Sequence, residues 1–202
     1  MLRKVLVRNY RAFKKFKLEL SPGVNIIVGN NDAGKSTLLE AINLALTARL
    51  HGYPIGSELT PHLFNQETTQ QYVHDLRRGR RPTAPEIIIE LYLDNAPRHA
   101  GLVGENNLLG EDCPGVRLKI VLDEDLRDGY QAYIADPEKV ALIPTEYYTY
   151  KWLDFGGNPI KNTRHLPDAS LIDASTIRLQ TGTDYFIRAV ISERFTRTVG
   201  QP

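Results

Sequence analysis

The stretch from Gly29 to Ser36, which reads GNNDAGKS, limits what this chain can fold into more than any other feature. It matches the pattern G-x-x-x-x-G-K-[ST] of a phosphate-binding loop. Glycines let the backbone fold around an anion, and successive N–H groups form a nest that the positive end of the next helix completes. In such a loop Lys35 contacts the β- and γ-phosphates, and the Ser36 hydroxyl is a ligand of Mg²⁺. The residues predicted to bind the nucleotide are Gly29, Asn30, Asn31, Asp32, Ala33, Gly34, Lys35, Ser36 and Thr37.

The residues on either side of this loop fit the same interpretation. Residues 24–29, VNIIVG, are a short apolar run, which is typical of a strand buried on both faces. From Lys35 to about Leu50 the apolar residues recur at helical spacing. The buried face of this helix is predicted to hold Leu38, Leu39, Ile42, Ala45 and Leu46. A buried strand followed by an amphipathic helix is the context that the loop requires.

Hydrophobic periodicity predicts the rest of the chain in less detail. Strands are predicted at 2–10, 13–20, 86–94 and 146–155, a short helix at 67–79, a loop at 95–115 and a closing helix at 184–195. The turn LRDG at 126–129 predicts a hairpin, because Gly129 tolerates positive φ. The aromatic residues of 146–155 are interpreted as sheet-stiffening rather than base-stacking residues.

Composition excludes several classes of protein. The formal net charge is +1, so overall charge does not favour nucleic acid, and the single cysteine, Cys113, excludes an internal disulfide. No apolar run reaches the about 18 residues of a membrane span, and charges interrupt the first residues too often for a signal peptide. The histidines are isolated and lack zinc-ligand spacing. We expect a soluble cytoplasmic protein with no membrane partner.

Three features of the sequence resemble the ABC-type ATPases of DNA metabolism, the RecF and structural-maintenance-of-chromosomes (SMC) group. Residues Asn9, Tyr10, Arg11 and Phe13 are similar to an Asn-aromatic-Arg motif in that group's opening hairpin. GVNIIVGNNDAGKSTLLEAI resembles its strand, loop and helix, and EIIIELYLD resembles its antiparallel subsheet. Within the group, GNNDAGKST and LIDAS…DYFIRAV look closest to the OLD (overcoming lysogenisation defect) nucleases of phage defence, which carry an N-terminal ATPase and a C-terminal Toprim nuclease domain.

The resemblance implies an α/β P-loop NTPase: the N-terminal portion of an ABC-type head, with an antiparallel β-subsheet next to the P-loop strand and helix. Its parts would be residues 1–50 (hairpin, loop and helix), 51–85 (a variable insertion) and 86–202 (subsheet and closing helix). It also implies ATP with Mg²⁺ as the ligand, Arg11 near the phosphates, and Gln180 as the glutamine that senses the γ-phosphate at the metal. From the residues alone, Arg11 could equally be a surface arginine, and Gln180 a loop residue.

Two elements that hydrolysis requires in this class are missing from the sequence. There is no Ser-Gly-rich signature, and no convincing acidic strand end for Mg²⁺. KIVLDED, which places Asp123 after an apolar run, imitates that acid, but the predicted hairpin makes its strand antiparallel. No Toprim-like cluster of acids appears. We therefore expect half a site, completed by a second ATPase head or by the remainder of a longer polypeptide. A non-catalytic ATP-binding scaffold and a small phosphotransferase using Asp123 remain alternatives.

Two basic stretches make DNA a candidate partner. LRRGRRP contains four arginines between residues 77 and 81, and the predicted strand 13–20 carries Lys14, Lys15 and Lys17. Cationic side chains of this kind neutralise a nucleic-acid backbone. A solvated loop or the exposed face of a strand explains them equally well.

Overall fold

The computed structural model describes residues 1–30, 33–169 and 171. The chain divides into two compact units, Met1–Ala169 and Ser170–Pro202. The predicted closing helix and Gln180 lie outside the described residues.

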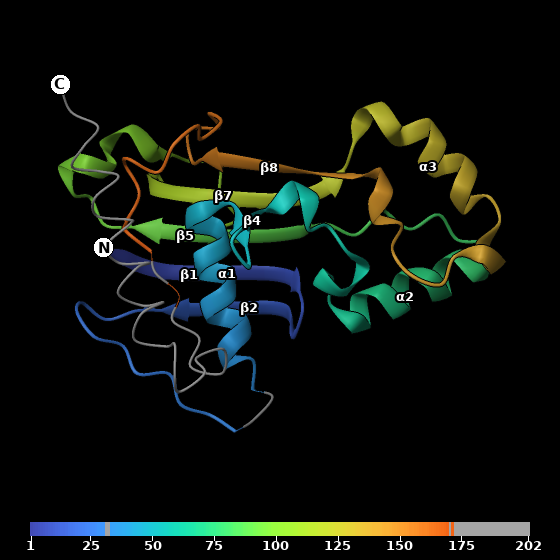
Figure 1. Ribbon diagram of the computed structural model, residues 1–202, viewed down its shortest axis with the longest axis horizontal. Helices are drawn as coiled ribbons and strands as arrows, with labels where there is room; N and C mark the ends of the chain where they lie inside the picture. Colours follow the sequence, from blue (N-terminus) through green and yellow to red (C-terminus); the bar gives the residue numbers. More distant parts are fainter. Residues whose placement is uncertain (31–32, 170, 172–202) are drawn as a thin grey trace, which may run out of the picture. The chain divides into compact units, whose positions relative to one another are not determined.

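An antiparallel sheet forms the centre of the first unit (Figure 1). Its strands follow the order β2-β1-β5-β7-β6, and β8 also pairs with β7. The bounds are β1 Leu2–Tyr10, β2 Phe13–Glu19, β5 Ile87–Leu93, β6 Val103–Gly104, β7 Cys113–Leu122 and β8 Tyr148–Asp154. Every pairing among them is antiparallel. The predicted hairpin and the predicted subsheet are therefore one sheet, in which β1 pairs directly with β5.

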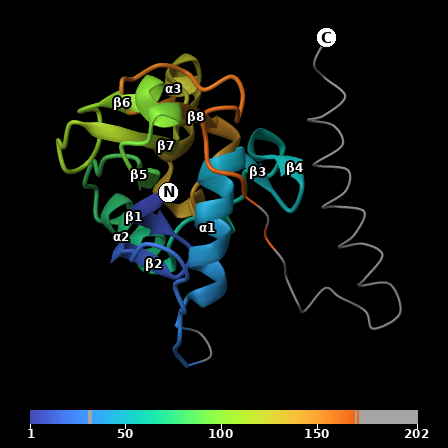
Figure 2. The same ribbon diagram turned by 90° about the vertical axis from the view of Figure 1, so that its left-hand side faces the viewer.

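Helix α1 (Lys35–Thr47) covers one face of this sheet (Figures 1 and 2). Leu38, Ala41, Leu44, Ala45 and Leu46 are buried against alternate residues of β1, β5 and β7, in agreement with the period of two in a strand. Part of the predicted helix face was wrong, because Leu39 is 46% exposed and Ile42 is only half-buried. The indole N–H of Trp152 on β8 donates to the Ala45 carbonyl at 2.8 Å and ties the helix to the sheet.

A buried ion pair organises the opposite face of the sheet. Glu90 on β5 is fully buried and meets the guanidinium of Arg117 on β7, with Oε1 2.7 Å from Nε and 2.6 Å from Nη2. The same carboxylate accepts the Tyr92 hydroxyl at 2.7 Å and the Leu108 backbone N–H at 3.0 Å. Burial and the Glu90 carboxylate raise the pKa of Tyr92. Both carboxylate oxygens therefore have donors, which compensates the cost of burying the charge, and the Leu108 N–H ties its loop to the sheet.

The remaining elements lie mostly in the insertion between α1 and β5 and in the stretch between β7 and β8. They are β3 Arg49–Leu50, β4 Tyr53–Pro54, α2 Gln66–Arg77 and α3 Arg127–Ile134, with 3-10 turns η1 Ile55–Ser57, η2 Pro61–Leu63, η3 Pro97–Leu102, η4 Glu124–Leu126, η5 Pro137–Lys139 and η6 Thr145–Tyr147. The predicted helix at 67–79 is confirmed as α2, which Asn65 caps by accepting the Thr68 N–H.

The predicted hairpin after LRDG was wrong, since α3 occupies that stretch and β8 takes the place beside β7. Tyr130, Tyr133 and Ile134 recur at helical spacing, and Tyr130 is buried with its hydroxyl hydrogen-bonded to that of Tyr72 on α2. This packing outweighs the turn preference of the Asp-Gly pair. Strand β7, which ends at Leu122 just before Asp123, is nevertheless antiparallel to β5, β6 and β8, as predicted.

The predicted buried strand at 24–29 was also wrong. This segment forms no strand, and the side chains of Val24, Ile26 and Val28 are 88%, 83% and 84% exposed. A strand needs a neighbour that takes up its N–H and C=O groups. Within the described part of the chain, no strand pairs with this segment.

Candidate nucleotide-binding site

The loop of residues 29–34 leads directly into the first turn of α1. Gly34 is the N-cap residue with φ +82°, a conformation that favours glycine. A Cβ at Gly34 would lie 2.8 Å from the ring of Phe13, so a side chain has no room there. The first turn of α1 contains no acidic residue, and the first amide bonded within the helix is that of Leu38, to the Gly34 carbonyl at 2.9 Å. The positive end of the helix is therefore open to an anion.

The ammonium group of Lys35 lies over the loop. Its Nζ donates to the carbonyl oxygens of Gly29 and Asn30, both at 2.7 Å. Ser36 follows on the exposed side of the helix and Thr37 is half-buried. Asn31 and Asp32 lie outside the described residues. The Lys35 ammonium group and the open N-terminus of α1 suit a phosphate chain, and the Ser36 hydroxyl suits Mg²⁺. The residues present therefore fit the predicted ligand.

A small cavity of about 350 Å³ adjoins the loop. Its lining is largely apolar and includes Phe13, Phe16, Ile27, Lys35 and Leu38. The rings of Phe13 and Phe16 stack with their centroids 4.2 Å apart. The stacked pair supports the loop from the side of β2, and Phe13 is the ring that excludes any side chain at Gly34.

The Asn-Tyr-Arg motif at the end of β1 is anchored to the same helix. The hydroxyl of buried Tyr10 donates to Oε1 of Glu40 on α1, and burial with the nearby carboxylate raises the pKa of Tyr10. Arg11 Nε lies 2.7 Å from the same oxygen. The N–H does not point at the carboxylate, so this contact is an ion pair and not a hydrogen bond. Arg11 is therefore paired with Glu40 rather than free at the surface.

Contacts from the insertion hold the motif in an unusual backbone conformation. Asn9 and Arg11 have φ of 56° and 45°, which is costly for residues with a Cβ. Asn9 Nδ2 donates to the Glu86 carbonyl at 2.9 Å, and its Oδ1 accepts the Thr68 hydroxyl at 2.8 Å. Asn65 Nδ2 donates to the Arg11 carbonyl at 2.8 Å. Strain held in this way is typical of functional segments.

Glu40 is the residue that sequence reasoning missed. Its place between two leucines and an alanine of α1 suggested only a polar position on the helix, and no spacing linked it to residues thirty positions earlier. His51 Nε2 also lies 3.5 Å from its second carboxylate oxygen. The cluster exists only because β1 and α1 pack together.

Asp123 has a local partner. Its carboxylate accepts the Asp125 N–H at 3.1 Å and caps η4. Among residues 1–30, 33–169 and 171, no three His, Cys, Asp or Glu side chains gather as a metal-ligand set.

Comparison with known proteins places this loop and sheet in a family. Residues 4–124 match the profile of the AAA domain. The chain belongs to the AAA domain family. With the relatives below, this makes the chain an ABC-type P-loop ATPase of the SMC and RecF kind.

Relatives of this AAA domain act in DNA repair and chromosome maintenance, by their names. It is 33% identical over 88 residues to a DNA double-strand break repair Rad50 ATPase of Methanopyrus kandleri, covering 44% of this chain and 8% of that protein. It is 43% identical over 58 residues to structural maintenance of chromosomes protein 6 of Saccharomyces cerevisiae, covering 29% and 5%. It is 36% identical over 73 residues to the DNA replication and repair protein RecF of Vibrio vulnificus, covering 36% and 19%.

The matched part spans at most 19% of the length of these relatives. The helices in the described part of the AAA domain are all too short or too polar to cross a membrane.

Proposed function

We propose that this chain is the ATP-binding part of an ATPase head that acts in DNA processing, with the OLD-type nucleases of phage defence as the specific family. The observation that carries the proposal is the open N-terminus of α1 with Lys35 over the loop, braced by Phe13 at Gly34. Gly29 to Thr37 hold the triphosphate, with Lys35 on the β- and γ-phosphates and Ser36 on Mg²⁺. The bound metal neutralises charge on the phosphates.

The chain provides binding and leaves hydrolysis to be completed from elsewhere. Phosphoryl transfer depends on positioning and charge stabilisation, and a loop without its acidic partner binds but hardly turns over. The exposed apolar side chains of 24–28 support this view, because such a row is normally covered. A second head, or the remainder of a longer polypeptide, supplies the missing groups and the cover. Gln180 belongs to this proposal as the candidate residue on the γ-phosphate side.

The alternative of a phosphotransferase that uses Asp123 has less support. Its strand is antiparallel, and its carboxylate already caps η4. The Asp123→Asn variant separates the two hypotheses. A head fragment should keep its ATP binding after this change, whereas a phosphotransferase should lose its turnover.

Titration calorimetry with ATP and Mg²⁺, together with a steady-state phosphate-release assay, tests the proposal. We expect micromolar binding, about −8 kcal/mol, with little turnover. Lys35→Ala should abolish binding, and Lys151→Ala, an exposed lysine on β8, should leave it unchanged. No binding by the folded chain would refute the proposal. Binding with turnover that survives Asp123→Asn would refute only the claim that the site is incomplete.

A further inference from the structure

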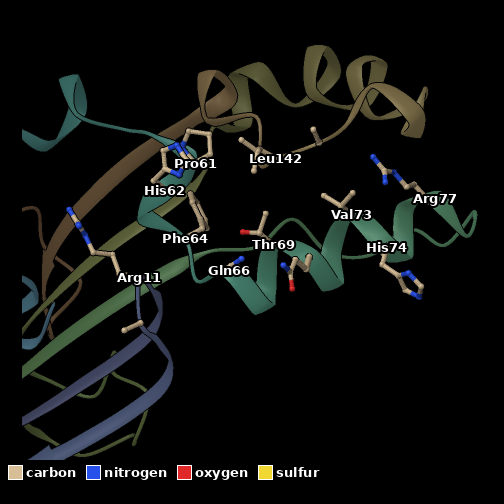
Figure 3. A pocket seen from close by; sticks show the side chains of 13 residues that line it. Arg11, Pro61, His62, Phe64, Gln66, Thr69, Val73, His74, Arg77 and Leu142 are labelled. Carbon is tan, nitrogen blue, oxygen red and sulfur yellow. The ribbon is translucent and has the colours of Figure 1, made fainter. Parts of the chain in front are cut away.

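A second cavity lies beside the turn between β1 and β2. It is bounded by α2 and by residues 141–142, which precede η6 (Figure 3). Its volume is about 860 Å³. We call it the α2 groove; its lining includes Arg11, His62, Phe64, Gln70, Arg77 and Leu142. Arg11 and Arg77 lie at its two ends, with Thr69 and Val73 of α2 between them (Figure 3). Among the residues that the structure describes, no aspartate or glutamate lines it.

The Arg77 end of the groove carries uncompensated positive charge. Arg77 Nη2 donates to the Val140 carbonyl at 3.3 Å, which positions the guanidinium without neutralising it. Arg78 and Arg81 follow, and neither has a carboxylate partner within the described residues. The nearby acids are engaged, since Asp75 pairs with Arg80 at 2.8 Å and Glu67 with Lys14 at 2.5 Å. A ligand in the groove therefore meets one guanidinium without a carboxylate partner, that of Arg77, whereas Arg11 at the other end is paired with Glu40.

The polar side chains of the groove stand along its α2 rim, although apolar atoms form the larger part of its surface. The apolar floor, Phe64 and Val73, is buried, whereas Gln66, Gln70 and Arg77 on α2 are exposed. An extended acidic peptide commonly binds by adding a strand to an exposed sheet edge, and none of the described lining residues belongs to a strand of the sheet. A phosphodiester backbone needs guanidinium and amide donors, which the rim does provide.

We propose that the α2 groove binds the backbone of a single strand of DNA. Arg77 contacts a phosphate, and Gln66 and Gln70 contact the sugars or base edges. The twelve residues of α2 are about 18 Å long, or about five nucleotides at the 3.4 Å rise of one strand. The volume is that of a small-molecule pocket, which suits one strand better than a duplex. The choice of DNA over RNA rests on the proposed function.

Fluorescence anisotropy with labelled dT15, measured on the whole chain at several salt concentrations, tests this inference. Arg77→Gln should weaken binding about five- to tenfold and reduce the salt slope by about 0.7, the value for one phosphate contact in a single strand. Gln70→Glu, an exposed change that places a like charge in the groove, should weaken it similarly. The matched controls are Lys151→Gln on β8 and Gln131→Glu on α3, which are exposed and outside the groove lining. Both should bind dT15 as the parent chain does, and urea unfolding should confirm that each variant is folded.

Several results would overturn the inference. The first two are no binding of dT15 at low salt and equal weakening of binding by the control variants. The third is tighter binding of a duplex than of dT15. The fourth is displacement of dT15 by polyglutamate at equal charge concentration, which would favour an acidic peptide. Weakening by Lys15→Gln alone would move the DNA contact to β2. Lys35→Ala should retain dT15 binding, so failure of the groove and failure of the nucleotide site are distinguishable.

Discussion

Replacing Glu90 by leucine is expected to be the most destabilising change in the sheet. The carboxylate is fully buried and accepts hydrogen bonds from Arg117, Tyr92 and the backbone of Leu108. The substitution leaves the Arg117 guanidinium, whose side chain is 18% exposed, without its anion. Breaking a buried pair costs about 3–5 kcal/mol, and the lost Leu108 contact is part of that figure.

We expect the free energy of unfolding to fall by about 4 kcal/mol. Against a total of about 5–15 kcal/mol, this is a large fraction. For a chain of 202 residues it corresponds to a Tm lower by about 8–16 °C. Urea unfolding followed by circular dichroism measures the loss.

A double-mutant cycle identifies its cause. Adding Arg117→Met to Glu90→Leu removes the unpaired charge, and should recover about 1.5 kcal/mol or more relative to Glu90→Leu alone. The control is the half-exposed pair of Lys119 and Glu86, 3.1 Å apart, where Glu86→Ala should cost less than about 1 kcal/mol. A loss below about 1.5 kcal/mol for Glu90→Leu, or strictly additive single variants, would refute the reasoning.

Three further predictions concern the loop, the insertion and the exposed segment. Gly34→Ala should lower the free energy of unfolding by about 1–2 kcal/mol in urea titrations, because φ is +82° and Phe13 occupies the space, and an unchanged midpoint would contradict this. The pKa of Asp75 lies below its ordinary value, chiefly through the hydrogen bond from Gln71, so its stabilising contribution is present above about pH 4 and is lost as pH falls below that. NMR titration should show the low pKa, and Gln71→Ala should raise it. Ile26→Lys should change the free energy of unfolding by less than about 0.5 kcal/mol, since the side chain is 83% exposed, and a loss above 1.5 kcal/mol, roughly that of a buried isoleucine, would place it in a core.

The elements that sequence predicted correctly are those whose signal is local. β1, β2, β5 and β8 have strand-like composition or alternation, and α2 has a capping asparagine and a clear amphipathic period. The loop from Gly29 to Ser36 was recognisable because its chemistry requires glycine, lysine and serine at fixed spacing. None of these assignments depends on what the segment later packs against.

The wrong predictions share one cause, which is that partners distant in the sequence decide the outcome. Residues 24–29 have the composition of a buried strand but lack a paired neighbour in the described part of the chain. Residues 127–134 have a good turn signal but fold as α3, because Tyr130 packs against Tyr72. Local preference is worth less than a buried aromatic contact.

The sequence by itself therefore determined the phosphate loop, the helix that follows it and most strands of the sheet. Only the tertiary structure decided that Tyr10 and Arg11 meet at Glu40, and that Arg77 stands at one end of a groove whose described lining contains no acid. A motif is a property of neighbouring residues, so its chemistry can be read along the chain. Ion pairs and grooves join residues whose separation in sequence carries no signal, because packing alone sets their distance.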